Sequence, residues 1–269
     1  MQTLTYLISF IALGVLARAF FSWEKDDTNV FAEEYRQEFV QESPVLTTPV
    51  EEIATETVIP EPEFPALIFN EVDNSPLIID NWPLPSSINH KVGFFSQAPD
   101  GNRNLPRQEA CEEASIALAN YFIKGKWLDK DLMRSDILAL VDRQMELFGD
   151  YLHTTIEQTK QLYEDFYGWE SYIIDNPTIE QIKSILAQWQ IIVAPFAGRK
   201  LGNPYYSGKG PVYHMMVLRW YDDTSIYTND VGTSRGENYR YSYATILDAN
   251  RDRADDINQW AKRMLVIVK

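Results

Sequence analysis

The sequence holds one residue that is suited to nucleophilic chemistry, Cys111. It lies in the stretch QEACEEASIALA, residues 108–119, and is the only cysteine in 269 residues. If Cys111 begins a helix, its sulfur lies beside unpaired amides and the positive end of the helix dipole, which favour a thiolate. A thiolate attacks carbonyl carbon when a neighbouring base is available. A single cysteine also excludes an intrachain disulfide and a metal site built from several thiolates.

Three acidic residues flank Cys111, and a carboxylate beside a thiol opposes the thiolate form. Glu109, Glu112 and Glu113 fall at the start of the expected helix, where the dipole favours acidic side chains. We therefore interpret Glu109 and Glu112 as ordinary first-turn acids, whose side chains need not point at the sulfur. If Glu112 or Glu113 faces a cleft instead, it would raise the thiol pKa or select a basic substrate.

A thiol nucleophile needs a base, and the chain has three histidines. His214 opens the apolar run HMMVLRW and follows a loop with four glycines, so its ring could face a cleft from the end of a strand. The positions of His90 and His153 favour surface or capping roles. On these grounds His214 is the candidate base.

The base in such a site is held by a third residue. The run SIYTND ends at Asn229 and Asp230, sixteen residues after His214. Two strands joined by the turn at 221–224 would lie side by side, which would bring Asp230 or Asn229 near the distal ring nitrogen of His214.

The elements that would position these residues follow from the hydrophobic periodicity. Helices are predicted at 111–124, 129–147, 155–166, from Asn176-Pro177 to about 189, and at 243–249. Strands are predicted at 191–196, 213–220, 225–229 and 264–268, with a strand or buried loop at 91–97. Helices that precede strands indicate an α+β fold.

The first part of the chain differs from the rest. Residues 4–23 are apolar over almost the length that crosses a bilayer, which predicts a membrane anchor in segment 1–23; cleavage as a signal peptide near Ala17-Arg18-Ala19 is the alternative. Segment 24–85 is predicted to be an acidic, proline-rich spacer, with one alternative strand near 57–60, and 86–269 the folded domain. We expect the domain to lie outside the cytoplasm, anchored or secreted.

Charge excludes one class of partner. The net charge is −15, and residues 24–63 carry twelve acidic residues against two basic ones. Such a chain repels phosphate backbones, so nucleic-acid binding is not expected.

Three segments together carry a family resemblance: VGFFSQAPDGNRNLPRQEACEEASIALANYF, AGRKLGNPYYSGKGPVYHMMVLRWYDD and YTNDVGTSRGENYRYSYATIL. They resemble the C39-like cysteine peptidases, whose fold is papain-like, with the cysteine on an N-terminal helical part and the histidine and aspartate on a C-terminal antiparallel sheet. The resemblance implies that Gln97 is the oxyanion-hole glutamine, Cys111 the nucleophile, His214 the base and acid, and Asp230 its orienting partner. It implies a peptide substrate and no cofactor or metal.

The sequence departs from the family pattern at three places. Glu112 stands where many members have glycine, and Gly93 where proline is common. Fourteen residues separate Gln97 from Cys111, so Gln108 is an alternative oxyanion residue.

Several functions fit these residues. A thiol-dependent hydrolase of peptide or related amide bonds leads. The alternatives are transglutaminase-like acyl transfer to an amine, a catalytically silent peptide-binding module tethered at a membrane, and a structural spacer without a cleft.

Overall fold

The computed structural model describes residues 84–253 and 260–268. The predicted anchor 1–23, nearly all of the predicted spacer 24–85 and the alternative strand near 57–60 lie outside the described residues, and these expectations remain predictions. Within the described part, no helix is both long and apolar enough to cross a bilayer.

All five predicted helices are present at about the predicted places, and the described residues contain one further short helix. They are α2 (Cys111–Ile123), α3 (Lys130–Phe148), α4 (Ile156–Tyr167), α5 (Ile179–Ala187), α6 (Gly198–Leu201) and α7 (Tyr243–Ala249), with a 3-10 turn, η1, at Arg107–Glu109. Capping residues set several boundaries. Thr155 and Thr178 each form a capping box at the start of α4 and α5, and Gly149 ends α3 in the left-handed conformation.

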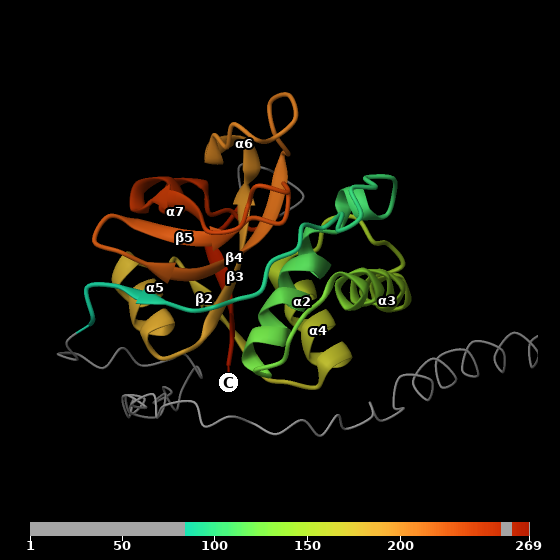
Figure 1. Ribbon diagram of the computed structural model, residues 1–269, viewed down its shortest axis with the longest axis horizontal. Coiled ribbons are helices and arrows are strands. Elements are labelled where there is room, and N and C mark those ends of the chain that lie inside the picture. Colours follow the sequence, from blue (N-terminus) through green and yellow to red (C-terminus); the bar gives the residue numbers. More distant parts are fainter. Residues whose placement is uncertain (1–83, 254–259, 269) are drawn as a thin grey trace, which may run out of the picture. The chain divides into compact units, whose positions relative to one another are not determined.

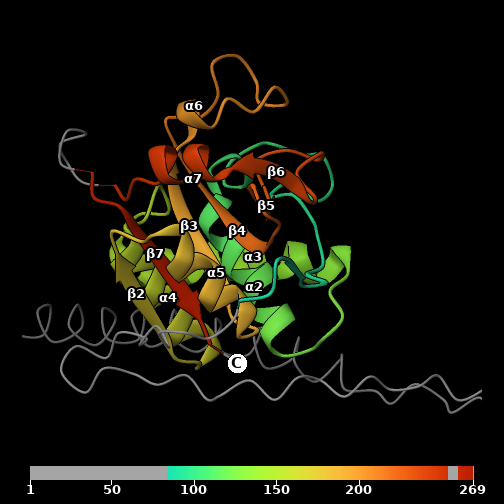
Figure 2. The same cartoon turned by 90° about the vertical axis from the view of Figure 1, so that its left-hand side faces the viewer.

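The strands form one sheet in which every pairing is antiparallel. They are β1 (Ile88–Asn89), β2 (Ser171–Asp175), β3 (Ile191–Ala197), β4 (Tyr213–Tyr221), β5 (Ser225–Asn229), β6 (Tyr239–Ser242) and β7 (Arg263–Ile267). Their order is β2-β7-β3-β4-β5-β6, and β1 pairs with β4. Figure 2 shows the strands of this sheet spread out side by side from β2 to β6, with β4 near the centre. The predicted class, helices with an antiparallel sheet, is confirmed.

The sheet is covered on both faces, because side chains alternate along its strands. On one face Ile191, Val193 and Val217 pack against α2, α3 and α4. On the other face Ile192 and Leu218 pack in a second core with α5, α6 and α7. Figure 1 shows the two groups of helices on opposite sides of the strands.

Segment 91–97 is a loop, the second of its two predicted alternatives, and the N–H of Gln97 bonds to the Val231 carbonyl in the loop after β5. Two details differ from the sequence-based expectations. The helix expected from Asn176 begins at Ile179, because the Thr178 side chain caps it and Asn176 has a left-handed φ of 47°. Strands β1, β2 and β6 were not predicted.

Candidate active site

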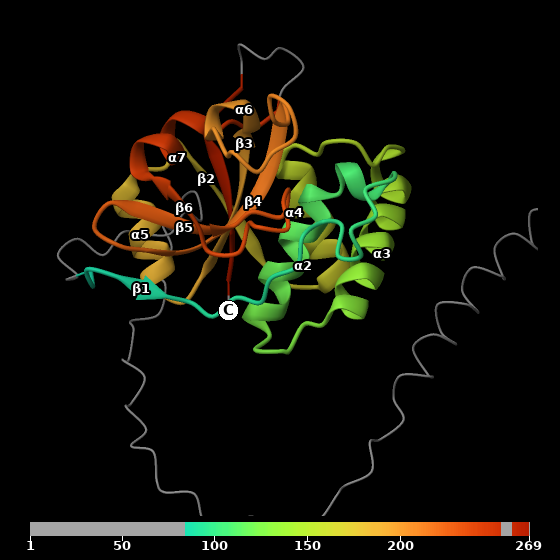
Figure 3. The ribbon, with the colours of Figure 1, turned by 45° about the horizontal axis from the view of Figure 1, so that its top comes forward.

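Cys111 is the first residue of α2, as the sequence predicts. The helix is buried along almost its whole length, and small residues such as Ala114 and Ala117 let it pack closely on β4. Figure 3 shows α2 lying beside β4. The Cys111 side chain is thereby fixed at the helix end, with 6% of its surface exposed.

Strands β4 and β5 bring His214 and Asp230 together. His214 is the second residue of β4, where it faces Phe196 of β3, and Asp230 directly follows β5. The predicted pairing of these strands is confirmed, with Val217 opposite Asn229. His214 Nε2 lies 2.7 Å from Asp230 Oδ1, and both side chains are buried. Asn229 instead donates to the carbonyls of the loop before α2, so Asp230 is the neighbour of His214.

Asp230 is held by further donors. Its Oδ2 accepts from Tyr206 Oη at 2.6 Å, Tyr241 Oη at 2.8 Å and Asn203 Nδ2 at 3.0 Å, and its Oδ1 also accepts from the Gly232 N–H. Burial opposes the charge, but His214 and the hydroxyl donors outweigh it and hold the Asp230 pKa below its usual value. An ionised Asp230 keeps the His214 proton on Nε2, which leaves Nδ1 as the acceptor.

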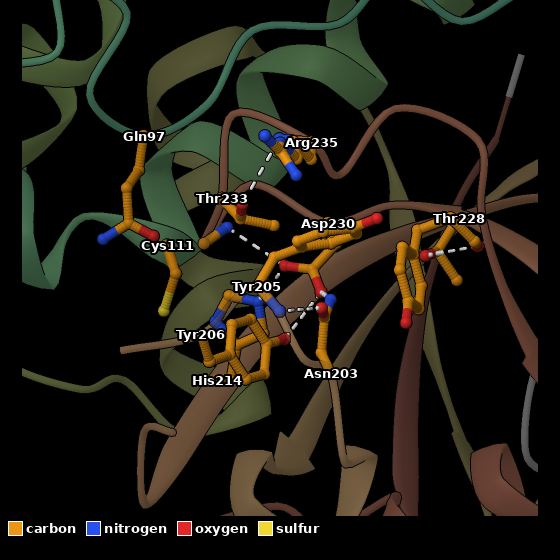
Figure 4. Close-up of polar contacts among 12 residues, drawn as sticks. Gln97, Cys111, Asn203, Tyr205, Tyr206, His214, Thr228, Asp230, Thr233 and Arg235 are labelled. Atoms are coloured by element: carbon orange, nitrogen blue, oxygen red, sulfur yellow. Dashed lines mark hydrogen bonds and ion pairs between the residues drawn. The ribbon is translucent and has the colours of Figure 1, made fainter. Parts of the chain in front are cut away.

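A cleft of about 520 Å³ joins these groups. Gln97, Cys111 and His214 all line it, with Tyr206 on the same wall as His214. Figure 4 shows Gln97 and Cys111 on one side and His214, Asp230 and Tyr206 on the other. Among the described residues no hydrogen bond joins the Cys111 sulfur to His214.

The Cys111 thiol donates to a carboxylate. Its Sγ lies 2.9 Å from Glu112 Oε2, and the other oxygen, Oε1, accepts the Thr154 N–H at 3.0 Å. Burial and then the Glu112 charge raise the pKa of the Cys111 thiol well above its ordinary value. The interpretation of Glu112 as an ordinary first-turn acid is therefore wrong. Its side chain is 1% exposed and reaches the sulfur, because the loop at Thr154 holds its far oxygen.

The Gln97 amide is also engaged. Its Nε2 donates to the carbonyls of Arg107 at 3.0 Å and Gln108 at 2.6 Å, in the turn that leads into α2. The loop from Gln97 therefore folds back onto the start of α2, although Gln97 lies fourteen positions before Cys111 in the sequence. Gln108, the alternative, also lines the cleft.

The other two histidines do not occupy plain surface positions. His90 is fully buried, with Nε2 bonded to the Leu186 carbonyl, and burial lowers its pKa to about 4. The surface or capping role expected for His90 is wrong. His153 lines the cleft, and its Nε2 lies 3.8 Å from a Glu109 oxygen.

The sequence did not reveal the residues that hydrogen-bond to Asp230 from distant parts of the chain. Asn203, Tyr206 and Tyr241 come from the glycine-rich loop and β6, and nothing in their local pattern marks them. Gly232 was also missed: a Cβ there would lie 2.8 Å from His214 Cε1, so only glycine fits beside the ring.

Comparison with solved structures gives distant likenesses, one of which is described below. No family model and no curated protein matches the chain. A solved structure from Bacillus anthracis, provisionally described as a C39-like peptidase, is 16% identical and covers 68% of this chain and 98% of its own, with a TM-score of 0.48. A likeness at this level says nothing about the chemistry of the site.

Proposed function

We propose that this protein is a thiol-dependent hydrolase that cleaves peptide or related amide bonds, with a papain-like division of its site. The observation that carries the proposal is the buried His214–Asp230 pair at a cleft that also contains Cys111. The helical part supplies the thiol, and the sheet supplies the imidazole and carboxylate. A surface histidine needs no such support, whereas a catalytic one must be held in one tautomer and orientation.

The first half of the reaction forms a thioester. His214 Nδ1 takes the proton from Cys111 Sγ, and the thiolate attacks the carbonyl carbon of the substrate. The C–N bond then breaks, and the proton on Nδ1 passes to the leaving amine. Asp230 stabilises the imidazolium that forms between these steps and keeps the second proton on Nε2.

The second half releases the acyl group. His214 Nδ1 takes a proton from water, hydroxide attacks the thioester carbonyl, and the proton returns to the departing Cys111 sulfur. An amine in place of water would give acyl transfer, the transglutaminase-like alternative, by the same steps. The open cleft favours water as the acceptor because water reaches it without a second binding site.

The negative oxygen of the tetrahedral intermediate needs donors. The Cys111 backbone N–H is one, since the first amides of a helix have no partner within it. The Gln97 amide is the other, once it exchanges a bond to the Arg107 or Gln108 carbonyl for one to the substrate. A donor of this kind contributes about 3–4 kcal/mol in comparable sites.

The test is turnover by the full-length chain. A library of synthetic decapeptides, analysed by mass spectrometry, should show new termini with the wild type and none with Cys111→Ser or His214→Ala. Circular dichroism and thermal melting of each variant would show that the fold is kept. Cleavage that persists in folded Cys111→Ser would refute the proposal.

A second candidate is a catalytically silent module that binds peptides in the same cleft. It is favoured by the thiol that donates to Glu112 and by the engaged Gln97 amide, since both key groups are occupied. Such a module would retain decapeptides in a pull-down with the wild type and release them uncut. Cleavage that depends on Cys111 and His214 would exclude it.

A further inference from the structure

Glu112 joins Cys111, which lines the cleft, to the loop before α4 through one buried carboxylate. Its Oε2 accepts from Cys111 Sγ, and its Oε1 accepts from the Thr154 backbone in the loop before α4. Because both oxygens are engaged, the carboxylate has one orientation. Cys111 itself is only 6% exposed, so its contact with Glu112 lies in a largely buried site.

We propose that Glu112 is a positioning residue that holds Cys111 as a neutral thiol, and that the nucleophile forms only when this contact is given up. Glu112 would hold the neutral thiol in this way even in a protein without enzymatic activity. The effect of this contact on turnover rests on the proposed function. In that setting His214 receives the thiol proton after the sulfur has left Glu112.

The charges around the sulfur support this role. A thiolate beside an ionised carboxylate in a buried site would place two negative charges together, which costs far more there than in water. The Met215 backbone acts in the other direction, with a weaker influence than burial and Glu112, and Glu113, next along α2, adds a smaller opposition to the thiolate. The helix dipole at α2 favours a thiolate but is opposed by these carboxylates.

Other ionisable groups also face Glu112. Burial raises the Glu112 pKa, and its interactions with Cys111 and His153 act against that rise. Tyr213 of β4 lies near both Glu112 and Cys111, and a Glu109 carboxylate oxygen lies 3.8 Å from His153 Nε2. Any pH profile of the thiol therefore includes these groups, so its interpretation needs matched variants.

Glu112→Gln tests the proposal most directly. The amide oxygen of glutamine still accepts the Thr154 N–H, while its NH₂ group stands beside the sulfur as a donor to a thiolate. Alkylation of Cys111 by iodoacetamide would be followed against pH in the full-length chain. The inflection should move down by at least about one pH unit, which is about tenfold faster labelling near neutral pH.

Slower labelling of Glu112→Gln would assign Glu112 a different role. If Glu112 were instead the base that removes the thiol proton, Glu112→Gln would slow labelling. Slower or unchanged labelling of the folded variant would overturn the proposal.

Two controls separate this effect from a general disturbance. Glu109→Gln removes an equal charge close by, but Glu109 does not contact the sulfur, so the inflection should move far less than it does in Glu112→Gln. If Glu112→Gln does not fold, the wild type suffices: its thiol should titrate above the ordinary ~8.5, and an inflection below neutral pH would overturn the proposal.

The two proposals can fail separately. A shifted inflection in Glu112→Gln together with no peptide cleavage would refute the hydrolase and leave the role of Glu112 intact. Cleavage that depends on Cys111 and His214, with no shift in Glu112→Gln, would refute only the role of Glu112.

Discussion

At the scale of single residues, the proposed site combines a histidine held by a buried aspartate with a cysteine held by a buried glutamate. Asp230 receives hydrogen bonds from three side chains and one backbone amide in addition to its contact with His214. Buried polar groups with this number of partners are rigid, and loss of one partner leaves the others unsatisfied. The His214 ring is therefore held in place before any substrate arrives. Cys111 is held just as firmly, but by a carboxylate that disfavours its reactive form.

Gly232→Ala should impair the site with little effect on the fold. The new Cβ would lie 2.8 Å from His214 Cε1 and 3.1 Å from Nε2, so the ring must shift away from Asp230. Misplacement of a catalytic group by about 1 Å costs on the order of 10²-fold in rate. We expect a loss of that size in kcat for peptide cleavage, and a change in melting temperature of only a few degrees.

Gly93→Ala is the matched control for this change. Its Cβ would meet only Leu128 Cβ at 3.8 Å, an ordinary contact, and Gly93 does not have a left-handed φ. Its kcat should equal that of the wild type. Equal kcat for folded Gly232→Ala would show that the position of the His214 ring does not limit the reaction.

Part of the site could be predicted from the sequence because it depends on local pattern. Cys111 at a helix start and His214 and Asp230 on neighbouring strands follow from periodicity and one turn. The contact of Glu112 with the sulfur does not, since its rotamer is fixed by Thr154, forty-two residues away in sequence. The same holds for Asn203 and Tyr241, whose approach to Asp230 depends on how the loop after α6 and the edge strand β6 fold.

At the scale of elements, capping residues decided boundaries that hydrophobic periodicity placed only roughly. Thr155 and Thr178 begin α4 and α5 through reciprocal bonds with a glutamine three residues on. The Asn176-Pro177 pair, which suggested an earlier start for α5, lies in the turn before the cap. Strand β2 was not predicted because SYIID is short and lies between two helical patterns. Strand β6, YRYS, is half exposed at the sheet edge.

The cap of α5 gives a prediction about stability. Thr178→Ala removes the side-chain oxygen that accepts the Gln181 N–H at 3.2 Å and leaves that amide without its partner. The free energy of unfolding should fall by about 1 kcal/mol, measured by urea denaturation. Thr178→Ser keeps the oxygen, and its free energy of unfolding should fall by only a few tenths of a kcal/mol. If both variants lose the same amount, the stabilisation comes from the threonine methyl group and not from the cap.

At the scale of the whole molecule, two fully buried ionisable groups, Glu113 and His90, give the stability opposite responses to pH. Glu113 is fully buried in α2, and neither carboxylate oxygen has a hydrogen-bond partner among the described residues. Burial, followed by the neighbouring Glu112, raises its pKa well above the usual value. His90 is also fully buried, and its pKa falls to about 4. The folded state therefore favours the uncharged form of both groups.

These shifts act on stability in opposite directions as pH falls. Glu113 keeps its proton in the folded state at pH values where the unfolded chain has lost it, so the folded state binds more protons and acid favours folding. His90 takes up a proton on unfolding between about 6.5 and about 4, so acid there favours the unfolded state. The two effects overlap in the wild type, and a comparison with a variant is needed to separate them.

Glu113→Gln should stabilise the protein in a pH-dependent way. Below the unfolded-state pKa of 4.5, Glu113 is protonated in both states, and the variant should gain nothing from the loss of its charge. As the pH rises beyond that value, the unfolded wild type ionises while the folded protein resists, so the penalty in the wild type grows. The gain of the variant in unfolding free energy should therefore rise with pH, by at most about 1.4 kcal/mol for each pH unit above that value. The His90 contribution is common to both proteins and cancels in the difference. Urea denaturation of both at several pH values between 4 and 8 measures this difference, and a gain that is independent of pH would show that Glu113 does not resist ionisation in the folded state.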